Sequence, residues 1–435
     1  MIVDFSVKNF CSIKSEQILN LNVEQGRERL ASNYANLEDG KLAVVRTAAI
    51  LGPNASGKSN FLRALTGLSW MVEHSGERKA DQQIPCYEPF ALSPEKRNEP
   101  VEFDIEFIVP SGLRYRYKIS YINDRVLTES LVSYPKRFQA VIFDRKEHDT
   151  WETIKFGNAY KGGARRFPFF ANNSYLSKAG NNASAPEIIR EIYDYFRKMH
   201  VIKPNHHLMT PGYHKKTENL EAIASLISSA DTGIENITLE KREKTNEIRF
   251  PDDMPEDLQE AIREQNKTKF SFWHKSENGS LVAFDEEAES DGTIRLFEML
   301  PIILDALTQG GVVLIDEIDA HLHSHLIRTV VDLFHDDEIN SEGAQLIFST
   351  HDLGILSSEI MRREQIWLTN KHDGQTSITC LDEFDKKLVR PNSPFHSFYN
   401  DGRLGATPRI QFEKIRNAIT CLKRTKKSQP VNKNA

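Results

Sequence analysis

The stretch GPNASGKSN, residues 52–60, decides the fold of this chain. It matches the pattern G-x-x-x-x-G-K-[ST] in full, and its glycines can expose the close-packed backbone N–H groups that triphosphate oxygens require. The mostly apolar run AVVRTAAIL (43–51) precedes it, and NFLRALTGLSWMV (60–72), with apolar residues at helical spacing, follows it. A loop between a buried strand and a helix places phosphates at the positive end of the helix dipole. We therefore predict a phosphate-binding loop rather than an ordinary loop before a helix.

Each polar residue of this loop has an expected role. Lys58 would reach the β- and γ-phosphates, and the Ser59 hydroxyl would bind Mg²⁺. The predicted nucleotide contacts in the loop are Gly52, Asn54, Gly57, Lys58, Ser59 and Asn60.

The run VVLIDE, residues 312–317, supplies a second candidate part of the same site. Its apolar residues predict a buried strand, which we expect to neighbour the strand before the loop. Two carboxylates project from its end, the edge where α/β proteins bind ligands. We expect Asp316 to hold Mg²⁺ and Glu317 to polarise the attacking water. The alternative is a strand that merely ends in an acidic turn.

Two further stretches select among nucleotide-binding classes. ESDGT (289–293) precedes a helix with an apolar stripe, and a Ser-x-Gly turn at a helix N-terminus can bind an anion. FSTHD (348–352) closes the next strand after VVLIDE, and a histidine at a strand end can hydrogen-bond a γ-phosphate. Taken alone, these would be a helix cap and a structural histidine. Their order and spacing favour one shared site.

This order of motifs resembles the ABC-type ATPases of the SMC, RecF and overcoming-lysogenization-defect branch. The resemblance implies ATP and Mg²⁺ as cofactors and an α/β P-loop head whose N- and C-terminal lobes are split by a mainly helical insertion. It also implies head-to-tail dimers, in which Ser290 and Gly292 of one copy cap ATP on the loop of the other. Asp319, in the stretch IDAH (318–321), matches a further nucleotide contact, and His351 matches the switch histidine.

Two features depart from that family pattern. Asp291 stands where the signature turn usually has a glycine. Gln82 and Gln83 lie near the expected position of the glutamine that couples Mg²⁺ to lobe motion, but not clearly at a strand end.

A narrower resemblance, to the RloA-type AAA family ATPases of phage-defence operons, covers nearly the whole chain. These ATPases are related to the AriA subunit of PARIS and the PtuA subunit of Septu. The resemblance implies a sensor or scaffold that controls a separate effector, nuclease-like and of TOPRIM or HNH type, after a DNA or phage-protein trigger. It rests on the stretches FSVKNFCSIKS, PFALSPE, ESDGTIRLFEMLP, IDEIDAHLH and GRLGATPRI. No nuclease motif is found in the sequence itself, so we expect the effector to be another protein.

The chain divides into four predicted parts. Residues 1–145 form an N-terminal ATPase lobe with antiparallel strands over 100–145, and 146–265 form the mainly helical insertion. Residues 266–412 form the C-terminal lobe, and 413–435 a basic, solvated tail. Predicted helices in the insertion cover 185–199, 217–230 and 255–265.

Composition excludes several classes of protein. The 435 residues are 39% apolar and 27% charged with a net charge of −6, typical of globular domains. Apolar runs such as VVLI fall far short of the roughly 20 residues that span a bilayer, so no membrane segment is expected. The absence of a secretory leader and the four scattered cysteines favour a cytoplasmic protein.

Alternatives remain open at this point. HLHSH (321–325) could suggest a metal site, but we favour the loop that the resemblance places directly after the acidic strand, and we expect His206-His207 to be surface or core residues rather than ligands. The alternating tyrosines of LRYRYKISYI (113–122) fit nucleic-acid stacking or, as we favour, one face of a strand. A DNA-binding repair ATPase of RecF or SMC type and a nucleotide-gated scaffold with negligible turnover are the alternative functions.

Overall fold

The computed structural model describes most of the chain. The described residues are 1–23, 28–135, 138–204, 217–230, 232–241, 250, 254, 259, 268–385, 389–405 and 412–427. Nearly all of the predicted helix 255–265, the pair His206-His207 and the end of the stretch GRLGATPRI lie outside these residues.

A six-stranded sheet carries the loop of residues 52–60. Its strand order is β11-β15-β16-β5-β17-β18, and all neighbours are parallel except the antiparallel pair β17–β18. The predicted strands are present, and β5 ends at the loop. The strands are β5 (Thr47–Leu51), β11 (Met199–Ile202), β15 (Val312–Ile315), β16 (Gln345–Ser349), β17 (Ile366–His372) and β18 (Gln375–Cys380).

Both faces of this sheet are covered, which explains why its strands read as continuous apolar runs. Successive residues of β5 alternate between two hydrophobic clusters, Ala48 and Ile50 in one and Ala49 and Leu51 in the other. The first cluster contains α1 (Lys58–Glu73) and α3 (Glu187–Arg197). The second contains α6 (Asp291–Gln309) and α7 (Ser324–His335). The loop helix α1 and the signature helix α6 therefore lie on opposite faces.

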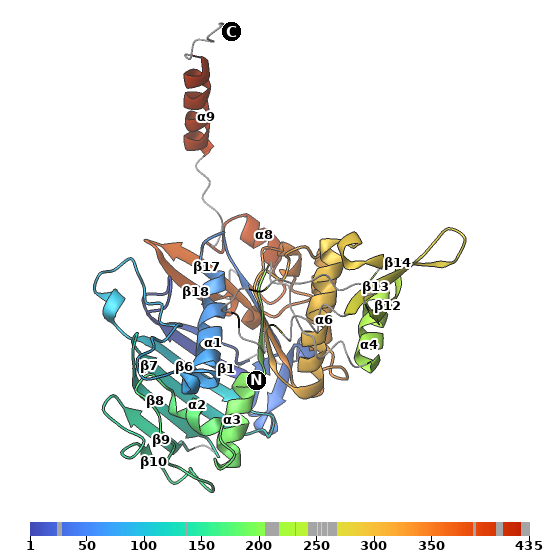
Figure 1. The fold of residues 1–435 in the computed structure, drawn as a ribbon. Helices are drawn as coiled ribbons and strands as arrows, with labels where there is room; N and C mark the ends of the chain where they lie inside the picture. The colour runs from blue at the N-terminus through green and yellow to red at the C-terminus, as the bar shows by residue number, and fades with distance from the viewer. Residues whose placement is uncertain are drawn as a thin grey trace.

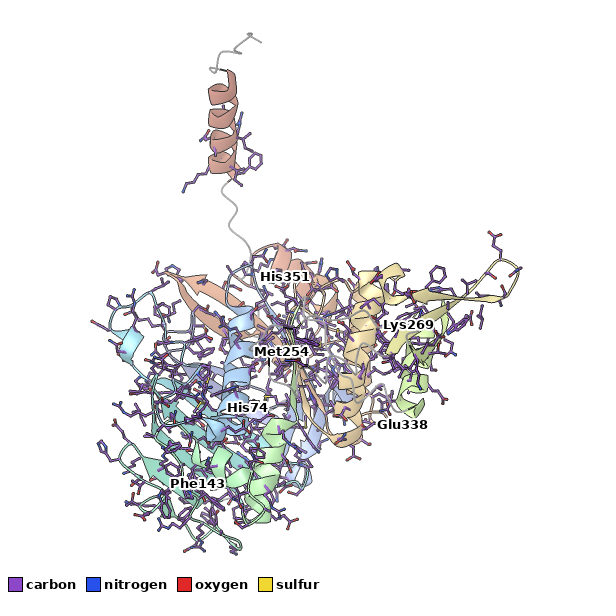
Figure 2. The ribbon with its side chains drawn as sticks, viewed as in Figure 1. His74, Phe143, Met254, Lys269, Glu338 and His351 are labelled. Carbon is purple, nitrogen blue, oxygen red and sulfur yellow. The ribbon has the colours of Figure 1, made fainter. Side chains whose placement is uncertain are left out.

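A seven-stranded antiparallel sheet lies beside α1, on the left of Figure 1. Its order is β10-β9-β8-β7-β6-β1-β2, and the strands expected over 100–145 are confirmed. Phe143 of β9 marks this layer in Figure 2. The strands are β1 (Ile2–Lys8), β2 (Gln17–Asn20), β6 (Val101–Ile108), β7 (Arg114–Tyr121), β8 (Val126–Ser133), β9 (Ala140–Lys146) and β10 (Lys155–Phe156).

The alternating tyrosines of β7 belong to the core. Tyr115, Tyr117 and Tyr121 are fully buried. On the opposite face of the strand, Arg116 donates to Asp104 Oδ1 at 2.7 Å and Arg114 donates to Glu106 Oε1 at 2.6 Å. The strand interpretation is confirmed, and these rings do not form a stacking surface for bases.

The range 146–265 contributes strands as well as the expected helices. It contains α2 (Tyr175–Gly180), α3 and α4 (Thr217–Ser228), and also β10, β11 and β12 (Ile234–Lys241). β11 pairs in parallel with β15, so this range completes the six-stranded sheet. β12 joins β13 (Thr268–Lys275) and β14 (Leu281–Asp285) in a three-stranded antiparallel sheet, on the right of Figure 1. The division into domains stays a prediction.

Smaller elements complete the architecture. A hairpin pairs β3 (Tyr34–Leu37) with β4 (Leu42–Val45), and α8 (Phe395–Asn400) packs in the second cluster through Phe395 and Tyr399. α9 (Phe412–Lys427) extends away from the rest of the molecule (Figure 1). Within the described residues, no helix has both the length and the apolar character to cross a membrane.

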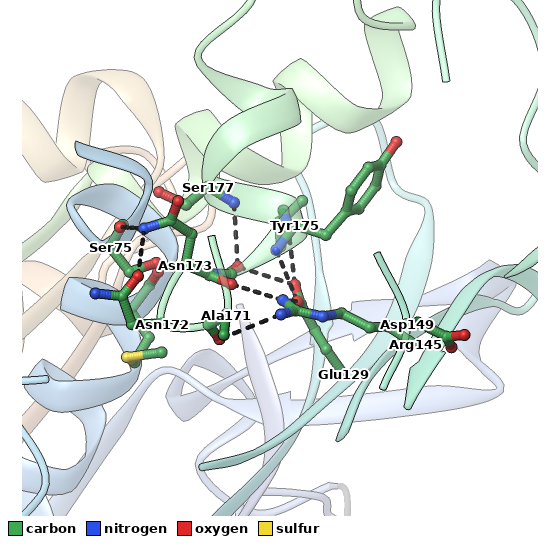
Figure 3. A network of polar contacts seen from close by, with 12 residues as sticks. Ser75, Glu129, Arg145, Asp149, Ala171, Asn172, Asn173, Tyr175 and Ser177 are labelled. Atoms are coloured by element: carbon green, nitrogen blue, oxygen red, sulfur yellow. Dashed lines mark hydrogen bonds and ion pairs between the residues drawn. The ribbon is translucent and has the colours of Figure 1, made fainter. Parts of the chain in front are cut away.

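A buried polar network ties the end of α1 to α2 (Figure 3). The Glu129 carboxylate of β8 accepts the backbone N–H of Tyr175 at 2.7 Å and lies 3.3 Å from Arg145 Nη1. Asn173 donates to the Ser75 carbonyl oxygen at 2.6 Å, just after α1. The helix that begins at the loop of residues 52–60 is thus fixed at its far end.

His335, at the end of α7, gives the fold a pH dependence. Its Nε2 accepts from Gln365 Nε2 at 3.1 Å and lies 2.8 Å from Thr47 Oγ1 at the start of β5. Burial, assisted by the positive charge of Arg46, lowers the pKa of His335 to about 3. Below pH 6.5 the His335 ring therefore binds a proton in the unfolded chain but not in the native protein. Acidification from pH 7 to 5 should cost about 2 kcal/mol of unfolding free energy through this group.

Replacing His335 by glutamine tests this assignment. His335→Gln should remove the part of the decrease in unfolding free energy between pH 7 and pH 5 that His335 causes. Urea denaturation at the two pH values measures this decrease. His325→Gln, at an exposed position near the start of the same helix, should leave the pH dependence unchanged. An unaltered pH dependence in His335→Gln would assign the acid sensitivity to other groups.

Candidate nucleotide-binding site

The loop of residues 52–60 leaves β5 and enters α1 at Lys58. Gly57 caps the helix with φ +106°, a left-handed conformation that favours glycine. A Cβ atom at Gly57 would lie 2.2 Å from Thr376 Oγ1. The second glycine of the motif is therefore required both by the backbone conformation and by the close approach of β18.

The Lys58 ammonium is buried inside the loop. It donates to the carbonyl oxygens of Gly52 at 3.0 Å and Pro53 at 3.3 Å. Burial lowers the pKa of Lys58, while the nearby carboxylates of Glu317, Asp316 and Asp319 oppose this effect. A buried ammonium held only by neutral carbonyls loses part of its hydration, and a phosphate would compensate for it.

The loop and the acidic strand meet in one hydrogen-bonded cluster. Ser59 Oγ donates to Asp316 Oδ1 at 3.0 Å, and Ser349 Oγ donates to the same oxygen at 2.6 Å. The prediction that these strands are neighbours was wrong, because β16 lies between β5 and β15. Ser349, at the end of β16, bridges the gap. A hydroxyl and a carboxylate oxygen in contact are the hard oxygen donors that suit Mg²⁺.

Glu317 has an unusual backbone conformation. Its φ is +52°, in the left-handed region that a side chain disfavours. Its backbone N–H donates to Ser349 Oγ at 2.7 Å, and the next N–H, of Ile318, donates to the Ser349 carbonyl oxygen at 3.0 Å. These two contacts with β16 thus fix a sharp turn of the chain directly after Asp316. Glu317 is half-buried.

Asp319 organises the end of β16. Its carboxylate accepts from Thr350 Oγ1 at 2.8 Å and from the His351 backbone N–H at 3.1 and 3.2 Å. The His351 side chain is exposed, near the upper edge of the main body and below α9 in Figure 2. The structure therefore joins Asp319 to the switch histidine within one chain, whereas a nucleotide contact for either residue stays a prediction.

The signature turn begins α6. Ser290 caps the helix, and its Oγ accepts the Thr293 backbone N–H at 3.1 Å. Gly292 packs so tightly against the following loop that a Cβ would lie 2.6 Å from the carbonyl oxygen of His321. Glu289, just before the turn, lies 2.7 Å from His274 Nε2 of β13. The turn is exposed at Ser290 and anchored on both sides.

Several polar residues beneath the loop escaped the sequence analysis. Asn60, whose nucleotide contact stays a prediction, donates to Ser12 Oγ at 2.6 Å. Ser12 contacts Thr376 Oγ1 at 2.6 Å, and Thr376 in turn donates to the Ser56 carbonyl oxygen at 2.7 Å. These hydroxyls support the loop from β18 and from the segment after β1. Ser12 lies in FCSI, but only the fold brings it to residue 60.

The remaining predicted loop residues are placed more simply. Asn54 is exposed at the loop apex. Gln82 lies in a separate turn, where its Oε1 accepts the Lys79 backbone N–H at 3.0 Å, and its neighbour Gln83 is exposed.

The histidines of HLHSH make a local contact. The rings of His323 and His325 stack with centroids 5.2 Å apart, and His323 Nδ1 accepts the backbone N–H of His325 at 3.3 Å. Among the residues that the structure describes, no group of three or more His, Cys, Asp or Glu side chains is arranged to hold a metal ion.

Comparison with known proteins gives one family. A family model described as "AAA domain, putative AbiEii toxin, Type IV TA system" matches residues 48–357, from the second residue of β5 to beyond His351. This match spans well over half of the chain. No curated protein sequence matches this chain.

Solved structures show distant likenesses. The SMC head domain from Thermotoga maritima is 11% identical with a TM-score of 0.40, covering 87% of this chain and 98% of that one. The SMC head from Pyrococcus furiosus bound to the C-terminal domain of ScpA is 15% identical, with a TM-score of 0.43 and coverages of 89% and 98%. The recombination mediator RecF is 12% identical, with a TM-score of 0.38 and coverages of 87% and 98%. These likenesses concern the fold alone.

Proposed function

We propose that this chain, which belongs to the AAA domain family matched over residues 48–357, is a Mg²⁺-dependent ATPase that closes head to tail with a second copy. The observation that carries this proposal is the shared oxygen of Asp316. Ser59, the residue after Lys58, and Ser349 of β16 both donate to this oxygen. Three strands that are distant in sequence thus deliver phosphate-binding and Mg²⁺-binding groups to one sheet edge.

The residues of this chain divide the chemistry between them. Lys58 exchanges its two carbonyl partners for phosphate oxygens and stabilises the charge that develops there. Glu317 accepts the proton of the attacking water, and His351 senses the γ-phosphate. Mg²⁺ held by Ser59 and Asp316 would neutralise charge on the β- and γ-phosphates.

Capping by a second copy completes the proposed site. Ser290 is exposed at the N-terminus of a helix of 19 residues, where backbone N–H groups favour an anion. Gly292 is fixed against the His321 carbonyl, two residues after Asp319. Ser290 and Gly292 would therefore contact ATP bound to the partner. Their turn packs against the loop of Asp319, which in turn binds the backbone of His351.

The biological role that we propose is the ATPase subunit of an anti-phage defence system. ATP-driven closure of this chain would hold or license a separate nuclease-like effector after a DNA or phage-protein trigger. The family description, which refers to a type IV toxin–antitoxin system, supports a role of this chain within a system of that kind. The narrower resemblance to RloA-type ATPases supports the division between sensor and effector.

Phage plating tests this role. Cells carrying the chain with its neighbouring reading frame should reduce plaque number relative to cells carrying either alone. Lys58→Ala in the pair should abolish the protection. Equal plating in all strains would contradict the defence role. Binding of duplex DNA by the purified protein alone, dependent on ATP, would instead favour a RecF-like repair function.

Lys58→Ala should weaken ATP binding about 10- to 100-fold. The change removes a charge-assisted hydrogen bond to phosphate, of about 1.5–3 kcal/mol, from a buried site. Titration with a fluorescent ATP analogue measures the loss. Arg63→Ala removes a cation from the same helix, but at an exposed position paired with Glu88, and should bind as the wild type does. Unchanged binding in Lys58→Ala would rule out the phosphate-binding role of this loop.

A further inference from the structure

Two exposed apolar surfaces of this chain lie in segments of opposite charge. One is a face of α9, and the other is the inner face of β14. In Figure 1 they project from different parts of the molecule.

The exposed face of α9 is a helical stripe. Phe412, Ile415 and Ile419 recur at helical spacing, and their exposed fractions are 68%, 48% and 48%. The described side chains of α9 interact within the helix, as in the pair of Arg416 with Glu413. A helix of 16 residues is marginal in water without packing. The stripe therefore calls for a covering surface.

The charge of α9 limits what can cover that stripe. The helix has six lysine or arginine residues and one glutamate. Pairing two copies of α9 would bring like charges together, which is unfavourable. A nucleic acid would meet the charge but leave the apolar stripe in water. The surface that suits α9 is apolar with an acidic rim.

β14 presents such a surface. It is an edge strand, all five of its residues are exposed, and the residues 276–289 around it include five carboxylates and no lysine or arginine. Val282 and Phe284 lie opposite His274 and Phe272 in the register, on the sheet face that packs against the helices. Their exposed fractions are 43% and 41%.

Among the residues that the structure describes, the helices that pack on this sheet contact β12 and β13. α4 packs on β12, and Phe297 of α6 contacts Phe270 and Phe272 of β13, with ring centroids 4.8 and 5.3 Å apart. Over β14, Phe284 contacts the His274 ring at 5.0 Å and remains open on its other side. One more amphipathic helix would continue the layer. A basic residue of such a helix would face the exposed carboxylate of Glu287.

We propose that α9 of one copy docks on the inner face of β14 of a second copy. Phe412, Ile415 and Ile419 cover Val282 and Phe284, and Lys414 and Arg416 lie toward the acidic rim. The two surfaces of the contact differ, so it is heterologous and builds rings or open chains of subunits. It requires no nucleotide and does not rest on the proposed ATPase function. β14 is joined through Glu289 to Ser290, so the contact lies beside the signature turn.

Sedimentation of the full chain without nucleotide tests this contact. The wild type should form assemblies that grow with protein concentration and weaken with salt. Ile419→Asp, in the stripe, and Val282→Asp, on the inner face, should each weaken association at least ~10-fold and leave a species of 49.8 kDa. Asn417→Asp, opposite the stripe, and Ala283→Asp, on the outer face of β14, make matched changes and should assemble as the wild type does. If Val282→Asp fails to fold, Glu287→Lys on the exposed rim replaces it.

Mixing the two defective variants distinguishes contact between copies from contact within one chain. Ile419→Asp retains a sound β14 and Val282→Asp retains a sound α9, so an equimolar mixture should form a one-to-one heterodimer and nothing larger. A monomeric wild type, full assembly by Ile419→Asp, or a mixture that stays monomeric would each overturn the proposal. If Ile419→Asp loses duplex DNA binding but assembles as the wild type does, α9 binds nucleic acid, and the proposal is equally overturned.

Discussion

Glu317→Gln should lower ATP turnover about 10³-fold while leaving ATP binding intact. Glutamine has the shape of glutamate but cannot accept the proton of the attacking water, and general-base catalysis contributes about 10²- to 10⁴-fold. The Ser349 contact that fixes this turn involves the backbone N–H of residue 317, so it survives the substitution. Lys58, Ser59 and Asp316 also keep their positions, and the variant should accumulate as an ATP-bound dimer.

Single-turnover phosphate release, together with sedimentation in ATP, measures both effects. Glu338→Gln makes the same chemical change at an exposed position that Figure 2 labels far from His351, and it should match the wild type. Full turnover in Glu317→Gln would exclude this residue as the base. If the wild type binds ATP and dimerises but turns over no faster than Glu317→Gln, the chain is a nucleotide-gated scaffold. If the variant neither retains ATP nor alters assembly, the head-to-tail mechanism is wrong.

Local patterns carried most of the fold prediction. The strand, loop and helix around residues 52–60 are consecutive in sequence, so their apolar spacing and two glycines were enough to place them. The same holds for α6, β15 and the hairpin strands β6 to β8. Ser59 and Asp316 were expected in one site because the loop before Ser59 and the residue Asp316 each follow the carboxyl end of a buried strand, and the two side chains are in contact at 3.0 Å.

Pairing between distant segments was not predictable in the same way. β11 has only four residues, two of them half-buried, and its sequence gives no reason to pair with β15 more than 100 residues later. The order β15-β16-β5 also depends on long-range pairing, so the bridging role of Ser349 was missed although FSTHD was recognised. The left-handed turn at Glu317 depends on that bridge. Periodicity reports which face is buried, and not which strand lies beside it.

The buried polar network between α1 and α2 was not predicted, for a related reason. Its members come from β8, β9 and the segment before α2, and each looks like an ordinary polar residue in sequence. Glu129 and Arg145 are 0% and 1% exposed, which is rare for charged side chains unless they are paired. Only the fold shows that one carboxylate serves both Arg145 and the N-terminus of α2, through Tyr175 and Leu176.

Glu129→Ala should therefore lower the free energy of unfolding by about 3–5 kcal/mol, because it leaves a buried cation without its partner. It also removes the acceptor of the Tyr175 and Leu176 N–H groups, at 2.7 and 2.9 Å. Urea denaturation measures the loss, and hydrogen exchange should show weaker protection in α2 and in the last turns of α1. Glu147→Ala breaks the exposed pair with Arg125, at 3.0 Å, and should cost no more than about 1 kcal/mol. Equal losses in the two variants, or unchanged protection at the end of α1, would show that the network does not hold the helix that begins at Lys58.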